Sequence, residues 1–211
     1  MKGIIAVCAV AAYAGTASSQ VMVFTDRASW EAAVGGSYTL EDFNGSSVQT
    51  IAPGATLDTG LLQVTRDGSP NANDGDLEIR PGTSFGNIDG TNFLYGETGI
   101  TPHENTLFGF NGQQVYAFGG DFASPFSGDG INISAGGQLF SLDGIGFGTG
   151  FYGIVDLGGS SLGQVSIVGD PGDITFQELW QADNISYAAV PTPASAILLG
   201  IGGLLATRRK R

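Results

Sequence analysis

The chain contains only one cysteine, Cys8, and only one histidine, His103, in 211 residues. Cys8 lies in an apolar segment near the N-terminus that we expect to be removed on export. The processed protein would then have no disulfide, no thiolate nucleophile and no cysteine-ligated metal. His103 lies in a probable loop, 101–105, and no Gly-x-Ser-x-Gly motif accompanies it. We therefore expect a surface histidine and no catalytic residue.

Positive charge is also scarce. All twenty Asp and Glu fall between residues 20 and 193, whereas only Arg27, Arg66 and Arg80 lie there, so this region has a net charge of −17. Nucleic-acid binding depends on Lys and Arg that neutralise phosphate, and we exclude nucleic acid as a partner. An acidic body is also repelled by anionic membranes and anionic polysaccharides unless a divalent cation lies between them.

Residues 1–19 have the three parts of a secretory signal peptide. Lys2 supplies a charged start, residues 4–14 form an apolar run, and residues 15–19 are small or hydroxylated. This order predicts an N-terminal signal helix and cleavage by signal peptidase after Ala17 or Ser19.

The last 22 residues combine a proline hinge, an apolar segment and a basic end. Pro191 and Pro193 favour an extended backbone. Residues 194–206 are small or apolar, and the four final residues are all basic. A helix of this length spans about 20 Å, against roughly 30 Å for the hydrocarbon core of a bilayer. We expect a C-terminal transmembrane helix that anchors the chain transiently, with its basic end in the cytoplasm.

This tail resembles the PEP-CTERM sorting signal of exported bacterial proteins. The resemblance rests on the residues Val190, Pro191, Thr192, Pro193, Arg208, Arg209, Lys210 and Arg211 around the apolar segment. Thr192 stands where the family's name has Glu. The resemblance implies that an exosortase, a membrane transpeptidase, recognises and cleaves the tail. It also implies a bacterium that makes exopolysaccharide, which is a potential partner. The chain then divides into a signal peptide at 1–19, a body at 20–188 and a sorting signal at 189–211.

The body shows the pattern of an all-β domain with one short helix. Thr25 is expected to cap a helix over 26–34, which Gly35 ends. Glycine, 35 residues in the whole chain, punctuates short segments of alternating apolar and polar residues. We expect strands at 21–24, 38–43, 61–66, 76–80, 92–95, 106–110, 114–122, 130–135, 138–142, 151–157, 162–168, 173–176 and 179–187.

This strand spacing predicts a β-sandwich of jelly-roll type. Residues 151–155 and 183–187 also resemble parts of the jelly-roll domains that PEP-CTERM proteins often carry. No fixed short period is present to indicate a β-solenoid.

Two acidic motifs have the composition of catalytic sites. Asp58-Thr59-Gly60 matches the aspartic-protease triplet, but that chemistry needs a second carboxylate and the chain has no second triplet. An ordinary turn is the better interpretation. Asp74, Asp76 and Glu78 would share one face of a strand and loosely resemble the carboxylate trio of sandwich-fold glycoside hydrolases. A solvated hairpin tip is the favoured interpretation, and a glycoside hydrolase is kept as an alternative.

A third acidic set indicates calcium, which binds six to eight oxygen ligands. In jelly-roll binding domains a structural calcium often joins an early strand to the last strand. By this analogy of fold, Glu41, Asp42 and Asp183 are the expected metal ligands.

We thus predict an exported, non-enzymatic protein of the cell envelope, cell surface or extracellular matrix, anchored in the membrane until it is sorted. Its role would be adhesive, structural or glycan-binding, as the PEP-CTERM resemblance implies. The alternatives are a calcium-dependent carbohydrate-binding module and, less favoured, a glycoside hydrolase.

Overall fold

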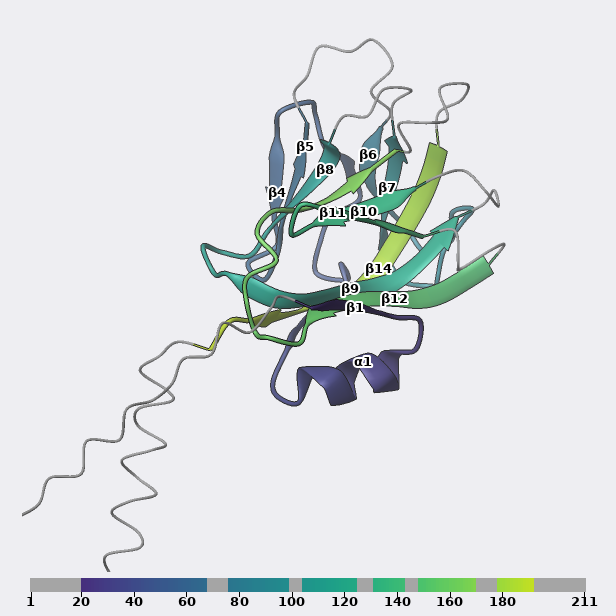
Figure 1. The fold of residues 1–211 in the computed structure, drawn as a ribbon. Coiled ribbons are helices and arrows are strands. Elements are labelled where there is room, and N and C mark those ends of the chain that lie inside the picture. Colours follow the sequence, from purple (N-terminus) through teal and green to yellow (C-terminus); the bar gives the residue numbers. More distant parts are fainter. Residues whose placement is uncertain are drawn as a thin grey trace, which may run out of the picture.

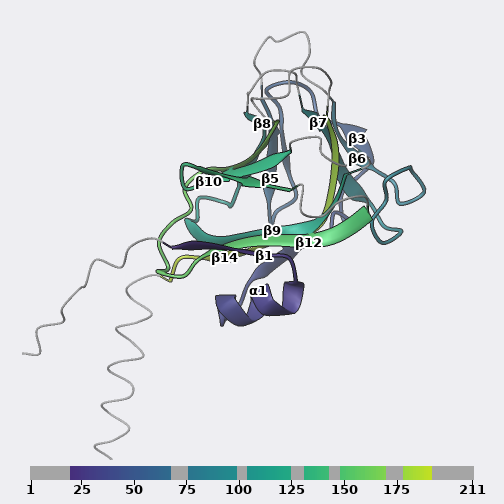
Figure 2. The same cartoon turned by 45° about the vertical axis from the view of Figure 1, so that its right-hand side comes forward.

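The computed structural model describes residues 20–67, 76–98, 104–124, 131–142, 148–169 and 178–191. In this part of the chain two antiparallel sheets face one another, and one helix covers the outer side of the larger sheet (Figure 1, Figure 2). The body is an all-β sandwich with one short helix, as predicted. The predicted signal peptide and the apolar segment 194–206 lie outside the described residues. Within the described residues, no helix combines the length and hydropathy that a membrane span requires.

The larger sheet has eight strands, and β14 (Glu178–Ala189) and β9 (Val115–Ser124) are its long central pair. The order across this sheet is β1 (Val21–Phe24), β12 (Gly148–Asp156), β9, β14, β7 (Phe93–Thr98), β6 (Leu77–Arg80) and β3 (Gln49–Thr50), and β2 (Thr39–Glu41) also pairs with β14. The register places Asp183 opposite Asp121 and Ile185 opposite Glu41. Strands far apart in the sequence therefore bring their acidic residues to the middle of one sheet.

The smaller sheet has six strands. Their order is β11 (Gln138–Ser141), β10 (Asn132–Ala135), β13 (Val165–Val168), β8 (Glu104–Gly109), β5 (Gln63–Arg66) and β4 (Thr56–Asp58). Gly136 and Gly137 connect β10 to β11 with φ angles of 61° and 73°. A two-residue hairpin turn of this type needs two positive φ angles, which explains the glycine pair and confirms the predicted hairpin.

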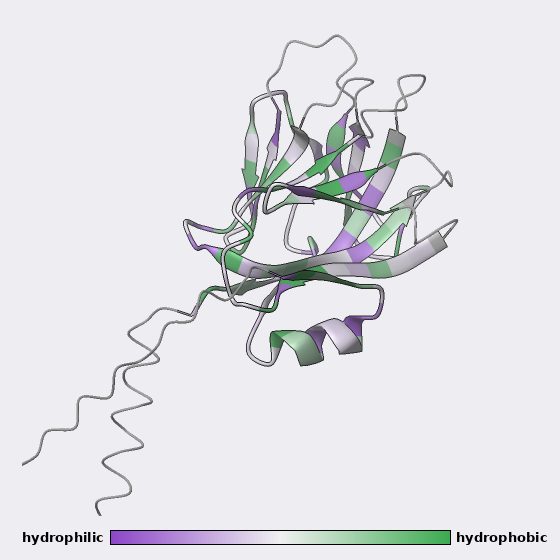
Figure 3. Cartoon of the chain, viewed as in Figure 1, coloured by the Kyte–Doolittle hydropathy of each residue, from purple (hydrophilic) through white to green (hydrophobic). Residues whose placement is uncertain are grey.

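Apolar side chains from both sheets form one core between them. Trp180, Phe118 and Phe108 are almost completely buried there. Apolar and polar residues appear as alternating bands along several strands (Figure 3), as expected when one face of each strand is buried. Gly96 of β7 lies directly opposite Trp180, and a Cβ on Gly96 would be only 2.2 Å from the indole ring. Only glycine leaves room for the ring at this point.

The helix α1 (Arg27–Val34) packs on the outer face of the larger sheet. Its N-cap is Asp26, whose side chain accepts a hydrogen bond from Ser29 N at 2.8 Å, and the prediction that Thr25 caps the helix is wrong. Gly35 ends the helix in the left-handed region, as predicted. Trp30 is fully buried, donates from Nε1 to Ile154 O and makes a tilted ring contact with Phe151. A small second core therefore fixes α1 to the sheet.

Most predicted strands are present with shifted ends. The sequence pattern did not indicate β3 and β4, because these two strands are short and mostly exposed and lack apolar alternation. The predicted strand at 173–176 lies outside the described residues.

Candidate functional site: an acidic pocket beside a carboxylate cluster

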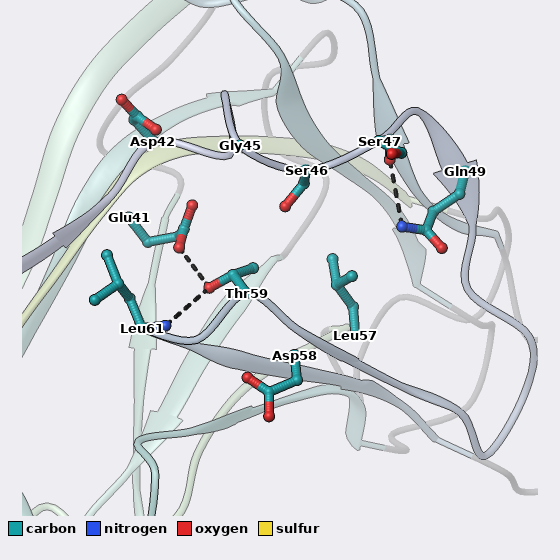
Figure 4. Close-up of a pocket in the computed structure, with 10 residues that line it drawn as sticks. All are labelled: Glu41, Asp42, Gly45, Ser46, Ser47, Gln49, Leu57, Asp58, Thr59 and Leu61. Atoms are coloured by element: carbon teal, nitrogen blue, oxygen red, sulfur yellow. Dashed lines mark hydrogen bonds between the residues drawn. The ribbon is translucent and has the colours of Figure 1, made fainter.

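A pocket of about 400 Å³ opens between the segment that follows β2 and the end of β4 (Figure 4). Its lining combines carboxylates, hydroxyls, one amide and two leucines. The lining residues are Glu41, Asp42, Gly45, Ser46, Ser47, Gln49, Leu57, Asp58, Thr59 and Leu61. None of these described residues is Lys, Arg or His, so the lining carries negative charge only. The volume lies within the range of small-molecule sites, about 300 to 1,000 Å³.

Glu41 lies at the inner side of this pocket. It is the last residue of β2 and is 5% exposed. Its Oε1 accepts a hydrogen bond from Phe43 N at 2.7 Å, and its Oε2 accepts one from the Thr59 hydroxyl. Figure 4 shows Glu41 and Thr59 pointing toward one another. These donors compensate the loss of water around a buried carboxylate.

The opposite side of the pocket is the turn between β4 and β5. Asp58 Oδ1 accepts from Gly60 N at 2.8 Å, and its Oδ2 accepts from Gln63 Nε2 at 3.2 Å. The backbone donor of Gly60, followed by the Gln63 amide, lowers the pKa of Asp58 below its usual value. Asp58-Thr59-Gly60 is therefore a hydrogen-bonded turn.

Two side chains from other strands hold this turn in place. Tyr187 of β14 donates its hydroxyl to Leu61 O at 2.6 Å, and Asn111 Nδ2 donates to Gly60 O at 2.9 Å. The shape of the pocket thus depends on contacts with β14 and with the turn before β9, not on the local sequence alone.

A second polar site surrounds Asp183, on the outer face of β14. Asp183 is 0% exposed. It accepts hydrogen bonds from Asn184 N at 2.7 Å and from the Thr91 hydroxyl at 3.2 Å. Burial first, and then the negative charges of Asp89 and Asp42, raise the pKa of Asp183 to about 7.

Asn184 and Arg27 connect the other carboxylates of this cluster. Asn184 Nδ2 donates to Asp121 at 3.0 Å and to Asp89 at 3.4 Å. Arg27 forms an ion pair with Asp121 at 3.1 Å and also donates to Asn184 O at 3.1 Å. We call Asp42, Asp89, Asp121 and Asp183 the carboxylate cluster, in which only Asp183 is buried. One arginine at one edge offsets only part of its charge.

The loop 81–92 between β6 and β7 covers this cluster and also touches the pocket wall. Asp89 accepts two hydrogen bonds from Thr91, at 2.6 and 2.9 Å, and these bonds lower its pKa. Asn92 donates from Nδ2 to Ser46 O at 3.1 Å and from its backbone N to Asn44 at 3.3 Å. The loop therefore connects the carboxylate cluster to the pocket.

The predicted calcium ligands are only partly brought together. Asp42 lies close enough to Asp183 to raise its pKa, whereas Glu41 bonds to Thr59 in the pocket. In the described ranges, no set of three or more His, Cys, Asp or Glu side chains is placed to hold a metal ion. Calcium binding by Glu41, Asp42 and Asp183 stays a prediction.

The carboxylates of the glycosidase alternative have separate partners. Asp76 lies 3.7 Å from Arg66, and Glu78 lies 2.6 Å from Arg80. Asp74 and His103 lie outside the described residues. The two carboxylates therefore contact different arginines.

Of the predicted sorting residues, Val190 and Pro191 are described. Val190 N donates to Gln114 O at 2.8 Å, so the first residue of the hinge still bonds to the body. Thr192, Pro193, Arg208, Arg209, Lys210 and Arg211 lie outside the described residues.

Sequence reasoning missed Asp89 and Thr91. The only local signal was Asp89-Gly90-Thr91, which is typical of an Asx turn and does not indicate its partners. No protein-family model matches this chain, and none of the curated proteins is similar to it. The function must therefore be argued from the chemistry of the two sites and from the chain ends.

Proposed function

We propose that this chain is an exported, non-enzymatic protein of the cell surface or extracellular matrix, delivered by its signal peptide and sorted by an exosortase at its tail. One observation carries the proposal: both ends of the body leave the sandwich together (Figure 1). Gln20 O accepts from Leu157 N beside the end of β12, and Val190 N donates to Gln114 O beside the start of β9. Since β12 and β9 are antiparallel neighbours, both ends lie at the same end of the sheet. A tail in a membrane would hold the body by that end and leave the opposite end exposed.

The finer fold assignment that we propose is a jelly roll formed by β7 to β14. Its support is the strand order: β7, β14, β9 and β12 are neighbours in the larger sheet, and β8, β13, β10 and β11 are neighbours in the smaller sheet. Apart from the β10–β11 hairpin, consecutive strands alternate between the sheets, as two nested Greek keys require.

The non-enzymatic part of the proposal is supported by the carboxylates of the pocket. Glu41 and Asp58 each accept hydrogen bonds from two donors of the protein. The backbone donor of Gly60 lowers the pKa of Asp58 and so favours the ionised form of that carboxylate. Glycoside hydrolysis needs a carboxylic acid that stays protonated near the operating pH. The pocket is better suited to binding than to acid catalysis.

Mass spectrometry of the protein isolated from its own cells tests the export proposal. We expect a chain that has lost residues 1–19 and the basic residues 208–211. Replacing Arg208, Arg209, Lys210 and Arg211 with alanine should leave the unprocessed tail on the protein. A mature surface protein that keeps residues 208–211 would contradict sorting by cleavage, and an intact chain in the cytosol would contradict export.

A calcium-dependent carbohydrate-binding module is the second candidate. The observation that favours it is the gathering of Asp42, Asp89, Asp121 and Asp183 from separate elements. The predicted ligands Asp42 and Asp183 could hold calcium together with Asp89, after a rearrangement of these side chains. An ion at 100 times its Kd would then stabilise the fold by about 2.7 kcal/mol.

Thermal unfolding with calcium and with a chelator tests this second candidate. Calcium should raise the Tm of the native protein but not the Tm of Asp183→Asn. It should also raise the Tm of Asp58→Asn, because this substitution lies outside the cluster. Equal Tm values for the native protein in calcium and in chelator would remove the candidate.

A further inference from the structure

We propose that the pocket between Glu41 and Leu61 binds one or two units of a neutral sugar, through hydroxyl groups that face its carboxylates and carbon faces that contact its leucines. This inference rests on the proposed surface role, to which it adds a site and a ligand class.

The charge of the pocket excludes anionic ligands. Its lining includes Glu41, Asp42 and Asp58, and the described lining residues contribute no positive side chain. The region between residues 20 and 193 carries three arginines against twenty acidic residues, so the long-range field has the same sign. A phosphate, sulfate or uronate would meet repulsion both at a distance and in contact.

The hydrogen bonds of the pocket favour hydroxyl groups over a positive ion. Each oxygen of Glu41 already accepts one hydrogen bond from the protein, whereas the carboxylate of Asp58 points away from Glu41 and Thr59 in Figure 4. A carboxylate oxygen has about two acceptor positions, so each oxygen of Glu41 retains capacity for one further donor in a fixed direction. A sugar hydroxyl can donate to such an oxygen.

The other polar residues of the lining complete this match. Ser46, Ser47 and Gln49 have groups that donate as well as accept. An ammonium group has donors only and cannot accept a hydrogen bond from these residues. A sugar hydroxyl both donates and accepts, as this mixed lining requires.

The apolar part of the lining matches the carbon faces of a sugar ring. Leu57 is half-buried, Leu61 is 47% exposed, and both side chains line the pocket that Figure 4 shows. The volume of about 400 Å³ is small for a site, which limits the bound portion to one or two rings. A longer glycan would extend from the open side into solvent.

Binding by the purified full-length protein tests the inference, with neutral tetrasaccharides of glucose and mannose as probes. A polyuronate serves as the anionic probe and 1,4-diaminobutane as the cationic probe. We expect at least one neutral tetrasaccharide to bind and the polyuronate and the diamine not to saturate. Binding of the diamine or the polyuronate alone would overturn the ligand class. No binding by any probe would overturn the inference as a whole.

Two matched variants locate the site. Leu61→Arg places a long cation beside Glu41 and Asp58 and should weaken saccharide binding about tenfold or more. Leu139→Arg adds the same charge at a side chain that is 54% exposed on β11, at the opposite edge of the sheet that contains β4 and β5, and should bind as the native chain does. Circular dichroism spectra and Tm values of both variants identify any loss caused by misfolding.

Equal binding by the native chain and both variants would overturn the pocket as the site. That outcome would leave the proposed surface role intact, because export and tail cleavage are measured independently by mass spectrometry. Conversely, the chain could retain its tail while Leu61→Arg weakens saccharide binding. That result would support the pocket as the sugar site and contradict the proposed sorting.

Discussion

Replacing Asp183 with asparagine is expected to stabilise the protein at pH 8, by up to about 4 kcal/mol. Asp183 is 0% exposed and has Asp89 and Asp42 as negatively charged neighbours. Its ionised form is therefore costly in the folded state. Asparagine keeps the acceptor for Asn184 N and adds an amide that can donate to Asp89, much as a protonated Asp183 would.

The sign of the pH dependence follows from the pKa values of Asp183 in the two states. Its pKa is about 7 in the fold, against an ordinary value of 3.8. Between these values the folded protein binds a proton that the unfolded chain does not. The contribution of Asp183 to the free energy of unfolding is therefore full below about pH 4, falls as the pH rises from 4 to 7, and is lost above pH 7. The free energy of unfolding of Asp183→Asn should lack this decrease between pH 4 and pH 7.

Urea unfolding at pH 5, 6, 7 and 8, followed by tryptophan fluorescence in a chelating buffer, measures the effect. The variant and the native protein should converge as the pH falls and diverge as it rises. Asp58→Asn is the control, because it removes one negative charge from an exposed turn. Its free energy of unfolding shows whether a lower net charge alone explains the gain in stability. If Asp183→Asn were no more stable than the native protein at pH 8, the prediction would be wrong. Asp183 would then be ionised in the folded protein, with its negative charge stabilised by other groups.

Replacing Gly96 with alanine is expected to lower the free energy of unfolding by about 3 kcal/mol. The added Cβ would lie 2.2 Å from Trp180 Cζ2 and 2.3 Å from Cε2. Trp180 is 1% exposed and packs among the core residues of both sheets, so its ring cannot move away without opening the core. Either the β7–β14 pairing or the core must shift.

Two further variants make this result specific. At Gly45 an added Cβ meets no heavy atom within 4 Å, so Gly45→Ala should change stability by less than about 0.5 kcal/mol. Trp180→Phe gives a smaller ring, and the double variant with Gly96→Ala should lose less than the sum of the single losses. Strict additivity of the two single effects would show that the clash with Trp180 is not the cause.

The sequence predicted those elements whose determinants lie close together in the chain. The helix Arg27–Val34 was predicted because a left-handed glycine and an apolar face mark it, although its cap is one residue later than expected. The hairpin at Gly136-Gly137 was predicted because two consecutive positive φ angles need glycine. The strands Gln49–Thr50 and Thr56–Asp58 were missed because strands this short depend on their neighbours for pairing.

The candidate sites were harder to predict because they depend on strand register. Glu41 and Asp42 are adjacent in the chain, yet Glu41 bonds to Thr59 in the pocket and Asp42 acts on the buried Asp183. Successive side chains of an extended chain point to opposite sides, so one acidic pair is divided between two sites. Asp89 belongs to the loop 81–92, and no local sequence pattern indicates which residues this loop contacts.

By itself, the sequence determined the properties that need no long-range contact. These are the strongly acidic body, the single cysteine at position 8, the alternating strands with glycine turns and the distinctive chain ends. Only the tertiary structure decided which carboxylates meet, which are buried and where a pocket opens. The physical reason is that pairing between distant strands is a collective result of core packing. A shift of one residue in the register of β14 and β9 would separate Asp183 from Asp121 without changing the composition of the chain.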